Sequence, residues 1–173
     1  MMLIKIFPAT ITDFKTIQEV GKETFFETFA ASNTEEVMQQ YLQSSFSTEK
    51  VKSELANSNS LFFIAWDDHM PIGYLKVNMN GAQTELQENE SLEIERIYVK
   101  ADYHGKKVGQ LLYDQAINVA IQHQKKSMWL GVWEENPKAI RFYEKNGFVP
   151  FSKHSFKMGE EEQTDILMRK LLV

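Results

Sequence analysis

The chain has 173 residues, of which 43% are hydrophobic and 25% are charged, as in an ordinary soluble globular protein. Its 24 acidic and 19 basic residues give a formal net charge of -5, which argues against a nucleic-acid-binding protein because such proteins usually carry a basic surplus. The absence of cysteine excludes a disulfide framework, a thiolate metal site and a cysteine nucleophile. We expect one domain over residues 1–173, acting on a small molecule.

Neither a targeting signal nor a membrane span is predicted. The N-terminus lacks the basic, apolar and small-residue pattern of a signal peptide. The longest plainly apolar run, Leu61–Trp66, is far too short to cross a bilayer. The four histidines show no metal-ligand spacing, although His154 could be an active-site group. We therefore expect a cytoplasmic protein without a metal ion.

The first third of the chain predicts one strand followed by three helices. Leu3–Phe7 alternates weakly, as a strand does. Apolar residues then recur at helical spacing over about 12–29, 35–43 and 48–57, with Thr12 or Asp13 as the first N-cap. The small polar residues of 30–34 predict a loop between the first two helices.

After Asn57–Ser60 the pattern changes from helical to extended. Leu61–Trp66 and Ile72–Met79 flank the turn residues 67–71 and predict a hairpin. Residues 80–89 are polar and predict a loop. Leu92–Val99 follows as a buried strand.

A turn with two glycines, His104–Gly109, then leads into an apolar helix that starts at Val108 and ends at Lys125-Lys126. A strand, a turn and a helix start present backbone N–H groups, and the helix dipole favours an anion there. We interpret this turn as a cradle for a pyrophosphate, although a plain surface loop before a core helix shows the same residue types.

The last third predicts a strand, a helix and a terminal hairpin. Met128–Trp133 is apolar. Asn136 before Pro137 is a strong helix start, and Asn146-Gly147 predicts its end through a left-handed cap. Strands at 148–158 and 164–172 surround a turn at 159–162. The sum is an α/β layer fold, with helices on a mixed sheet.

Two blocks of this sequence resemble the GNAT (Gcn5-related N-acetyltransferase) superfamily. Leu92–Val99 with His104–Gly109 is similar to the family's fourth strand and acetyl-CoA loop, and Asn136–Phe148 is similar to its Asn-x-x-Ala…Tyr-x-x-x-Gly-Phe signature. Trp129–Glu134 and the tail His154–Asp165 resemble the bacterial Pai-type spermidine/spermine N-acetyltransferases. The resemblance implies a mixed, mostly antiparallel sheet flanked by helices. It also implies transfer of an acetyl group from acetyl-CoA to a primary amine of a small cationic acceptor, most of all a polyamine, in a ternary complex.

The resemblance also implies roles for individual residues. Tyr143 stands at the position of the general acid, although its spacing alone would fit a core tyrosine. Glu93 and Glu95 are candidates for the general base; the alternatives are pairing with Arg96 or lysines, and a water chain acting instead. Glu27, Phe29 and Tyr41 are candidates for acceptor binding. The expected coenzyme contacts are Ile97, Tyr98, Val99, His104, Gly105, Lys106, Lys107, Val108, Gly109, Gln110, Asn136, Lys138 and Tyr143.

The coenzyme loop departs from the family pattern at two positions. His104 stands where the family has Gln or Arg, and Lys107 stands where it has glycine. A left-handed backbone at Lys107 would cost roughly 1 kcal/mol, and an exposed pairing with a coenzyme phosphate would recover about as much. This departure motivates one alternative, a module that keeps the fold and the coenzyme for regulation. The sequence also leaves open an acetyltransferase for another amine, such as a protein N-terminus or an antibiotic amine. A homodimer is also possible, because dimers are common in the family.

Overall fold

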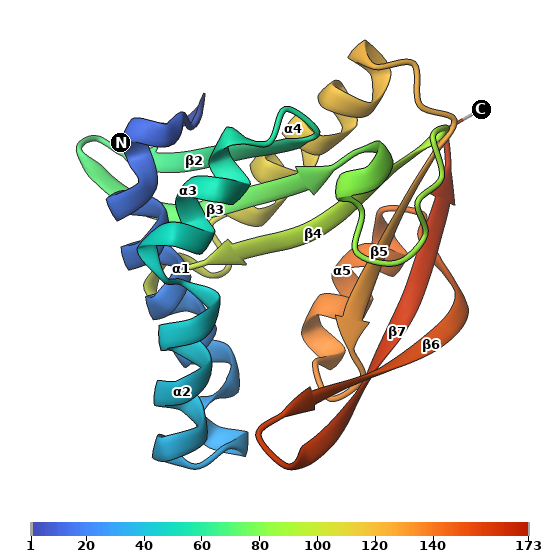
Figure 1. Cartoon of the computed structure of the whole chain (residues 1–173). Helices are drawn as coiled ribbons and strands as arrows, with labels where there is room; N and C mark the ends of the chain where they lie inside the picture. The colour runs from blue at the N-terminus through green and yellow to red at the C-terminus, as the bar shows by residue number, and fades with distance from the viewer. Residues whose placement is uncertain (1, 173) are drawn as a thin grey trace.

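The computed structural model describes residues 2–172, which form a seven-stranded sheet in the order β1-β2-β3-β4-β5-β7-β6 (Figure 1). Neighbouring strands are antiparallel except β4 and β5, which are parallel. The strands are β1 Ile4–Pro8, β2 Ser60–Asp67, β3 Met70–Asn78, β4 Ser91–Val99, β5 Ser127–Trp133, β6 Val149–Met158 and β7 Glu161–Leu171. The helices are α1 Phe14–Phe29, α2 Glu35–Ser45, α3 Thr48–Ala56, α4 Val108–Gln122 and α5 Pro137–Lys145. The predicted mixed, mostly antiparallel sheet with flanking helices is confirmed.

The helices cover the two faces of the sheet as separate groups (Figure 1). The apolar sides of α4 and α5 pack with Leu92 and Ile94 of β4 in one core cluster. The helices α1, α2 and α3 pack with Phe62 and Tyr74 in a second cluster on the opposite face. Because side chains alternate along a strand, the central strands β2, β3, β4 and β5 each contribute to both clusters. We therefore look for a ligand-binding site where neighbouring strands of the sheet separate between the two clusters.

Local sequence signals fix most helix ends. Asn136 accepts a hydrogen bond from the Ala139 N–H at 3.2 Å, and Pro137 takes the first helical position of α5. Gly147, with φ +91°, ends this helix in the predicted left-handed cap. The start of α1 was predicted less well. Asp13 accepts from the Thr10 N–H at 2.8 Å instead of capping α1, so a short 3-10 turn at Ile11–Asp13 precedes the helix.

The terminal hairpin is tighter than the sequence predicted. Met158 pairs with Glu161, so only Gly159 and Glu160 form the turn, and the predicted turn over 159–162 is wrong at its second half. Gly159 has φ +66°, which glycine adopts without strain and which a two-residue turn needs. An ideal Cβ on Gly159 would lie 2.8 Å from Val37 Cγ2, so this turn packs closely on α2.

Two irregularities open the middle of the sheet. The parallel strands β4 and β5 pair only from Ser91–Glu93 to Ser127–Trp129, and beyond Glu93 they diverge. In β4, Arg96 pairs with Lys76 but Ile94 pairs with Val77, so Glu95 is the extra residue of a β-bulge. The bulge lets Ile94 and Ile97 both join the α4-side cluster although they are three residues apart. After the bulge, Tyr98 packs with the α1–α3 cluster and the Arg96 guanidinium lies over the Phe46 ring of the same cluster.

Candidate active site

Two hollows meet where β4 and β5 diverge. One is a groove of about 540 Å³ between the end of β4, the loop before α4, and α5. The other, which we call the central cavity, has about 410 Å³ and lies on the α1–α2 face of the sheet. Because the two share a wall, a ligand in the groove can present one end to a second molecule in the cavity. The shared wall consists of Thr28, Ile97, Tyr98, Asn136, Ala139 and Tyr143.

The groove has the features that a long phosphorylated ligand requires. Lys107, directly before α4, has φ 64° and ψ 14°, so the left-handed conformation considered for this residue is present. The first N–H groups of α4 have no helical partner and face outward with the positive end of the dipole. An ideal Cβ on Gly109 would meet nothing within 4 Å, so a ligand can approach the backbone there. Beyond Glu93, the backbone of β4 on the side of β5 is unpaired.

The predicted coenzyme contacts gather at this groove, with one exception. The exception is Lys106, whose Nζ lies 4.8 Å from the centre of the Tyr103 ring. The predicted residues that line the groove are Ile97, Tyr98, Val99, His104, Gly105, Lys107, Val108, Gly109, Gln110, Asn136, Lys138 and Tyr143. That they bind a coenzyme stays a prediction.

His104 ties three elements together at the edge of the groove. Its Nε2 lies 2.7 Å from the Val99 carbonyl oxygen, so Nε2–H donates to that oxygen. Its Nδ1 is then an acceptor and receives a hydrogen bond from Lys138 Nζ at 3.3 Å. The histidine that replaces the family's Gln or Arg thus links β4, the loop and α5.

Aromatic side chains line the α1–α2 side of the central cavity. The ring of Phe25 stacks on Phe29 and on Tyr41, each with centroids 4.5 Å apart, and Phe29 lies 4.9 Å from Trp133. Phe29 and Tyr41, two of the predicted acceptor residues, therefore face the cavity. Glu27 lies elsewhere: its carboxylate accepts a hydrogen bond from the Ala101 N–H at 2.6 Å and ties α1 to the segment after β4.

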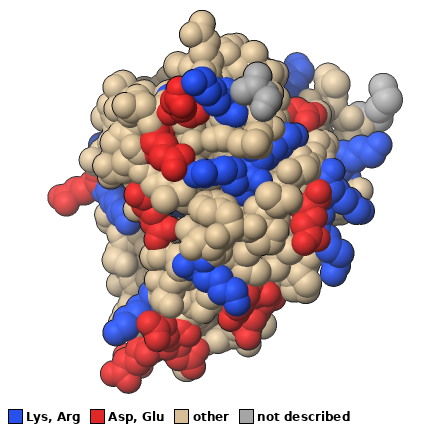
Figure 2. All heavy atoms as spheres, turned by 90° about the vertical axis from the view of Figure 1, so that its right-hand side faces the viewer, with Lys and Arg blue, Asp and Glu red and all other residues tan. Residues whose placement is uncertain are grey.

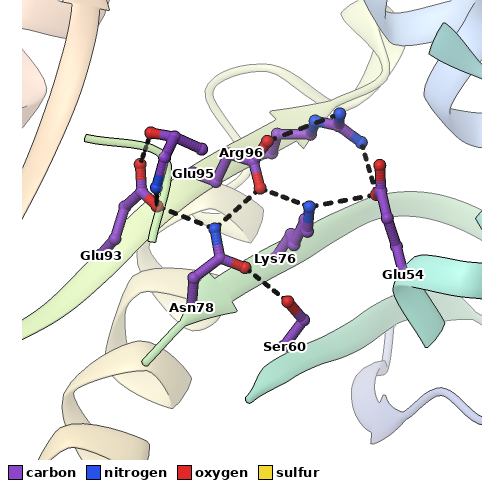
Figure 3. A network of polar contacts seen from close by, with 8 residues as sticks. Glu54, Ser60, Lys76, Asn78, Glu93, Glu95 and Arg96 are labelled. Atoms are coloured by element: carbon purple, nitrogen blue, oxygen red, sulfur yellow. Dashed lines mark hydrogen bonds and ion pairs between the residues drawn. The ribbon is translucent and has the colours of Figure 1, made fainter. Parts of the chain in front are cut away.

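A network of buried polar contacts lies beside the cavity (Figure 3). Lys76 Nζ lies 2.5 Å from Glu95 and 3.0 Å from Glu54, and Arg96 lies within 3.8 Å of both carboxylates. Burial alone would raise the pKa of Glu95, but Arg96 and Lys76 hold it below its ordinary value. A carboxylate held in this way is a poor proton acceptor. The pairing with Arg96 and a lysine, which the sequence left open for both glutamates, is thus found at Glu95.

Glu93 has a different environment from Glu95 (Figure 3). Its carboxylate is 3% exposed and accepts hydrogen bonds from Asn78 Nδ2 at 2.8 Å and the Thr84 N–H at 2.9 Å. The Thr84 hydroxyl also donates to it, and within residues 2–172 no cationic side chain pairs with it. Burial raises the pKa of Glu93, and the hydrogen bonds from Asn78 and Thr84 offset part of that rise. Glu93 is therefore the better proton acceptor of the two.

Tyr143 lies on the shared wall between the groove and the cavity. Its side chain is buried, and burial raises the pKa of its hydroxyl well above the ordinary range, with a further contribution from Tyr113. The hydroxyl therefore stays protonated at neutral pH and can donate a proton to a group that lies between the two hollows.

Three further titratable residues line the cavity from the opposite side. His154 of β6 pairs across the hairpin with Asp165 of β7, and Glu85, from the loop before β4, contacts His154. The pKa of Asp165 is raised to about 6, because burial and, to a smaller extent, Glu85 raise it more than His154 lowers it. The sequence alone did not predict Glu85 or Asp165 as functional residues, because each lies in a polar stretch and the two are 80 residues apart in the chain.

The surface over this part of the sheet carries mixed charges. Figure 2, viewed from the side of β6 and β7, shows acidic and basic side chains interspersed, with acidic ones gathered at the lower end, where Figure 1 has the β6–β7 turn. In residues 2–172, no helix is long and apolar enough to cross a membrane. The same residues contain no group of three or more His, Asp or Glu side chains arranged to hold a metal ion.

Comparison with known proteins gives consistent matches. The model of the "Acetyltransferase (GNAT) family" matches residues 22–148. An uncharacterised N-acetyltransferase of Lactobacillus delbrueckii subsp. lactis is 35% identical over 98% of both chains. The spermidine N(1)-acetyltransferase of Thermoplasma acidophilum is 28% identical, also over 98% of both. The crystal structure of the PaiA N-acetyltransferase from T. acidophilum in complex with coenzyme A superposes with a TM-score of 0.81 at 27% identity, covering 98% of this chain and 99% of that one.

The strained backbone at Lys107 can be tested by substitution. Lys107→Gly is expected to raise the free energy of unfolding by about 1 kcal/mol, because glycine adopts the left-handed conformation without a Cβ clash. Lys106→Gly is the matched control: it removes the same charge at a residue without a positive φ and is expected to lower stability slightly. Urea unfolding measures both. Equal losses in the two variants would contradict strain at Lys107.

The raised pKa of Asp165 predicts a pH-dependent gain from Asp165→Asn. Because the folded-state pKa of about 6 exceeds the ordinary aspartate value of 3.8, ionisation of Asp165 destabilises the native state as pH rises from about 4 to 6. The unscreened value is about 3 kcal/mol, and partial solvent exposure reduces it to about 1–2 kcal/mol. Urea unfolding should therefore show that Asp165→Asn is more stable than the wild type at pH 7 but not at pH 4. Asp102→Asn, at an exposed carboxylate, should show no such difference, and a pH-independent effect of Asp165→Asn would refute the prediction.

Proposed function

The chain belongs to the acetyltransferase (GNAT) family and is an acetyl-CoA-dependent N-acetyltransferase, and on that premise we propose that it acetylates a primary amine of a polyamine such as spermidine or spermine. The amine attacks directly while both substrates are bound. The 28% identical relative named as a spermidine N(1)-acetyltransferase supports this acceptor. A cytoplasmic location and a homodimer remain predictions from the sequence.

The observation that carries the proposal is the lining of the central cavity. It combines aromatic rings with four carboxylates, those of Glu85, Glu93, Glu95 and Asp165. Of the two basic groups on its wall, Arg96 is engaged with Glu95, and His154 contacts Glu85. A polyamine has cationic nitrogens separated by methylene groups, which suit carboxylates and aromatic faces respectively.

The size of the cavity supports a small acceptor rather than a protein chain. Its volume is about 410 Å³, and the β6–β7 turn packs on α2 through Gly159 and Val37. An exposed peptide end stays an alternative that the experiment below separates.

The groove supplies the coenzyme site in this proposal. The N–H groups at the start of α4, together with Lys107, suit the pyrophosphate, and the unpaired backbone of Ile97–Val99 suits the pantetheine arm. When bound, acetyl-CoA supplies the thioester carbonyl that the amine attacks. The shared wall around Tyr143 is where the reacting groups of the two substrates would meet.

Tyr143 and Glu93 are proposed to move the protons. The amine must be neutral to attack, and Glu93, whose pKa is raised by burial, can accept its proton directly or through water. The hydroxyl of Tyr143 stays protonated because burial raises its pKa, so it can protonate the departing thiolate. Glu95 serves in the buried ion-pair network with Lys76 and is not proposed as the base.

A panel of acceptors tests the function. Purified protein and acetyl-CoA should give the highest kcat/KM with spermidine or spermine, lower values with monoamines, and none with peptides that carry a free N-terminus. Release of free coenzyme A reports turnover, and mass spectrometry of the amine reports the product. Turnover on peptides but not on polyamines would refute the proposed acceptor, and tight coenzyme binding without any turnover would favour a regulatory module.

Tyr143→Phe tests the acid. It is expected to lower kcat about 100-fold, as for the loss of one general acid, while the affinity for acetyl-CoA stays within a few-fold. Tyr113→Phe is the matched control, because Tyr113 packs in the same core cluster but does not line the cavity. An unaltered kcat in Tyr143→Phe across the pH range would exclude Tyr143 as the acid.

A further inference from the structure

We infer that Glu85, His154 and Asp165 form a second ammonium subsite in the central cavity, which holds the distal cationic end of a diamine or polyamine while the reacting amine lies at Tyr143. The inference rests on the proposed function and deepens it. It predicts that the enzyme selects acceptors with two amines over acceptors with one.

The three residues lie at a separate end of the cavity. They line the cavity but not the groove, so they are not part of the wall that the two hollows share. His154 and Asp165 face each other across β6 and β7, and the loop before β4 brings Glu85 onto His154. An acceptor with its reacting amine at Tyr143 can therefore extend within the cavity toward this cluster.

The charges of this cluster are incompletely balanced. Glu85 has only His154 as a partner, and among residues 2–172 the carboxylate of Asp165 has neither a hydrogen bond nor an ion pair. Arg96, the other cationic side chain on the cavity wall, does not balance these carboxylates because it is engaged with Glu95 and Glu54. Two carboxylates with one imidazole leave a place for one more cation, and an ammonium group brings the charge and the donors that both carboxylates lack.

Gly131 leaves space beside the Asp165 carboxylate. It is the one exposed residue of β5, whose other residues are buried. An ideal Cβ on Gly131 would lie 3.3 Å from Asp165 Oδ2, so any side chain here would stand against that oxygen. Trp129 and Trp133 lie two residues away on either side and line the same cavity. The space thus borders a carboxylate and aromatic rings, the two surroundings that an alkylammonium group prefers.

Tyr74 gives an independent indication that a polar ligand enters this cavity. Its side chain is completely buried and lines the cavity wall, yet its hydroxyl has no hydrogen-bond partner in residues 2–172. Burial raises the pKa of Tyr74 to about 12, and the nearby Arg96 guanidinium offsets part of that rise, but no hydrogen bond of normal geometry joins the two side chains. Buried hydroxyl groups are nearly always satisfied, so a bound polar molecule is the expected partner.

The test compares two acceptors that differ only in the distal amine, 1,4-diaminobutane and butylamine. The ratio of their kcat/KM values measures the contribution of the second ammonium group. We expect the wild type to favour the diamine about 10- to 100-fold, as for a charge-assisted contact that is partly buried. Asp165→Asn and Glu85→Gln should each lower this ratio toward 1, mainly through a higher KM for the diamine.

Two further variants distinguish a direct contact between the distal ammonium group and the subsite from a general effect of the protein's net charge. Gly131→Ala keeps every charge but fills the space at Asp165, so it should also lower the ratio. Glu161→Gln removes a carboxylate from the same strand, at an exposed residue outside the cavity, and should leave the ratio unchanged. The affinity for acetyl-CoA and the melting temperature of each variant report whether the fold is intact.

The outcomes distinguish this inference from the proposed function. If the wild type acetylates neither amine nor spermidine, the proposed acceptor class fails and the subsite with it. If the wild type acetylates diamines but Asp165→Asn, Glu85→Gln and Gly131→Ala all keep its ratio, the subsite is refuted and the proposed function stands. Equal loss of the ratio in Glu161→Gln would also overturn it, because the effect would then come from net charge alone.

Discussion

The early end of the pairing between β4 and β5 is the constraint on which the rest of the structure depends. The two strands share hydrogen bonds only as far as Glu93 and Trp129, because β4 bulges at Glu95 and stays with β3 while β5 follows β7. A sheet that stays paired has no room for a ligand between neighbouring strands. Here the separation frees one edge of β4 for a ligand and opens a groove on one side and a cavity on the other.

The two glutamates of β4 differ in their partners although both line the cavity. Asn78 Nδ2 donates a hydrogen bond to each of them. Glu95 also pairs with Lys76 and Arg96, whereas Glu93 has only neutral donors among residues 2–172. These different partners move the pKa values of two neighbouring glutamates in opposite directions.

Burying so many ionisable groups costs stability, and the chain offsets only part of that cost. The Glu54–Lys76–Glu95–Arg96 network is internally neutral, so each of its buried charges has a partner (Figure 3). His154 offsets the charge of Asp165 only in part, and the raised pKa of Asp165 reports an unfavourable charge. Such local destabilisation is common at binding sites, because a group that is fully satisfied within the protein has nothing to offer a ligand.

The sequence by itself determined the elements and the family. Periodicity and capping residues gave the helices and strands to within a few residues, because these signals are local: Asn136 with Pro137 starts α5 and Gly147 ends it wherever the helix packs. The motif around His104–Gly109 and Asn136–Phe148 identified the residues of the groove for the same reason, since the turn and the helix start are each continuous in the chain. The sequence predicted Phe29, Tyr41, Glu93 and Glu95 for the reaction site, but it could not predict which other charged groups line the cavity with them. Glu85, His154 and Asp165 come from a loop and two strands, and Glu27, which the family resemblance suggested for the acceptor, contacts Ala101 instead. Only the tertiary structure decided these contacts, because they depend on the bulge and on the separation of β4 from β5, which involve residues far apart in the chain.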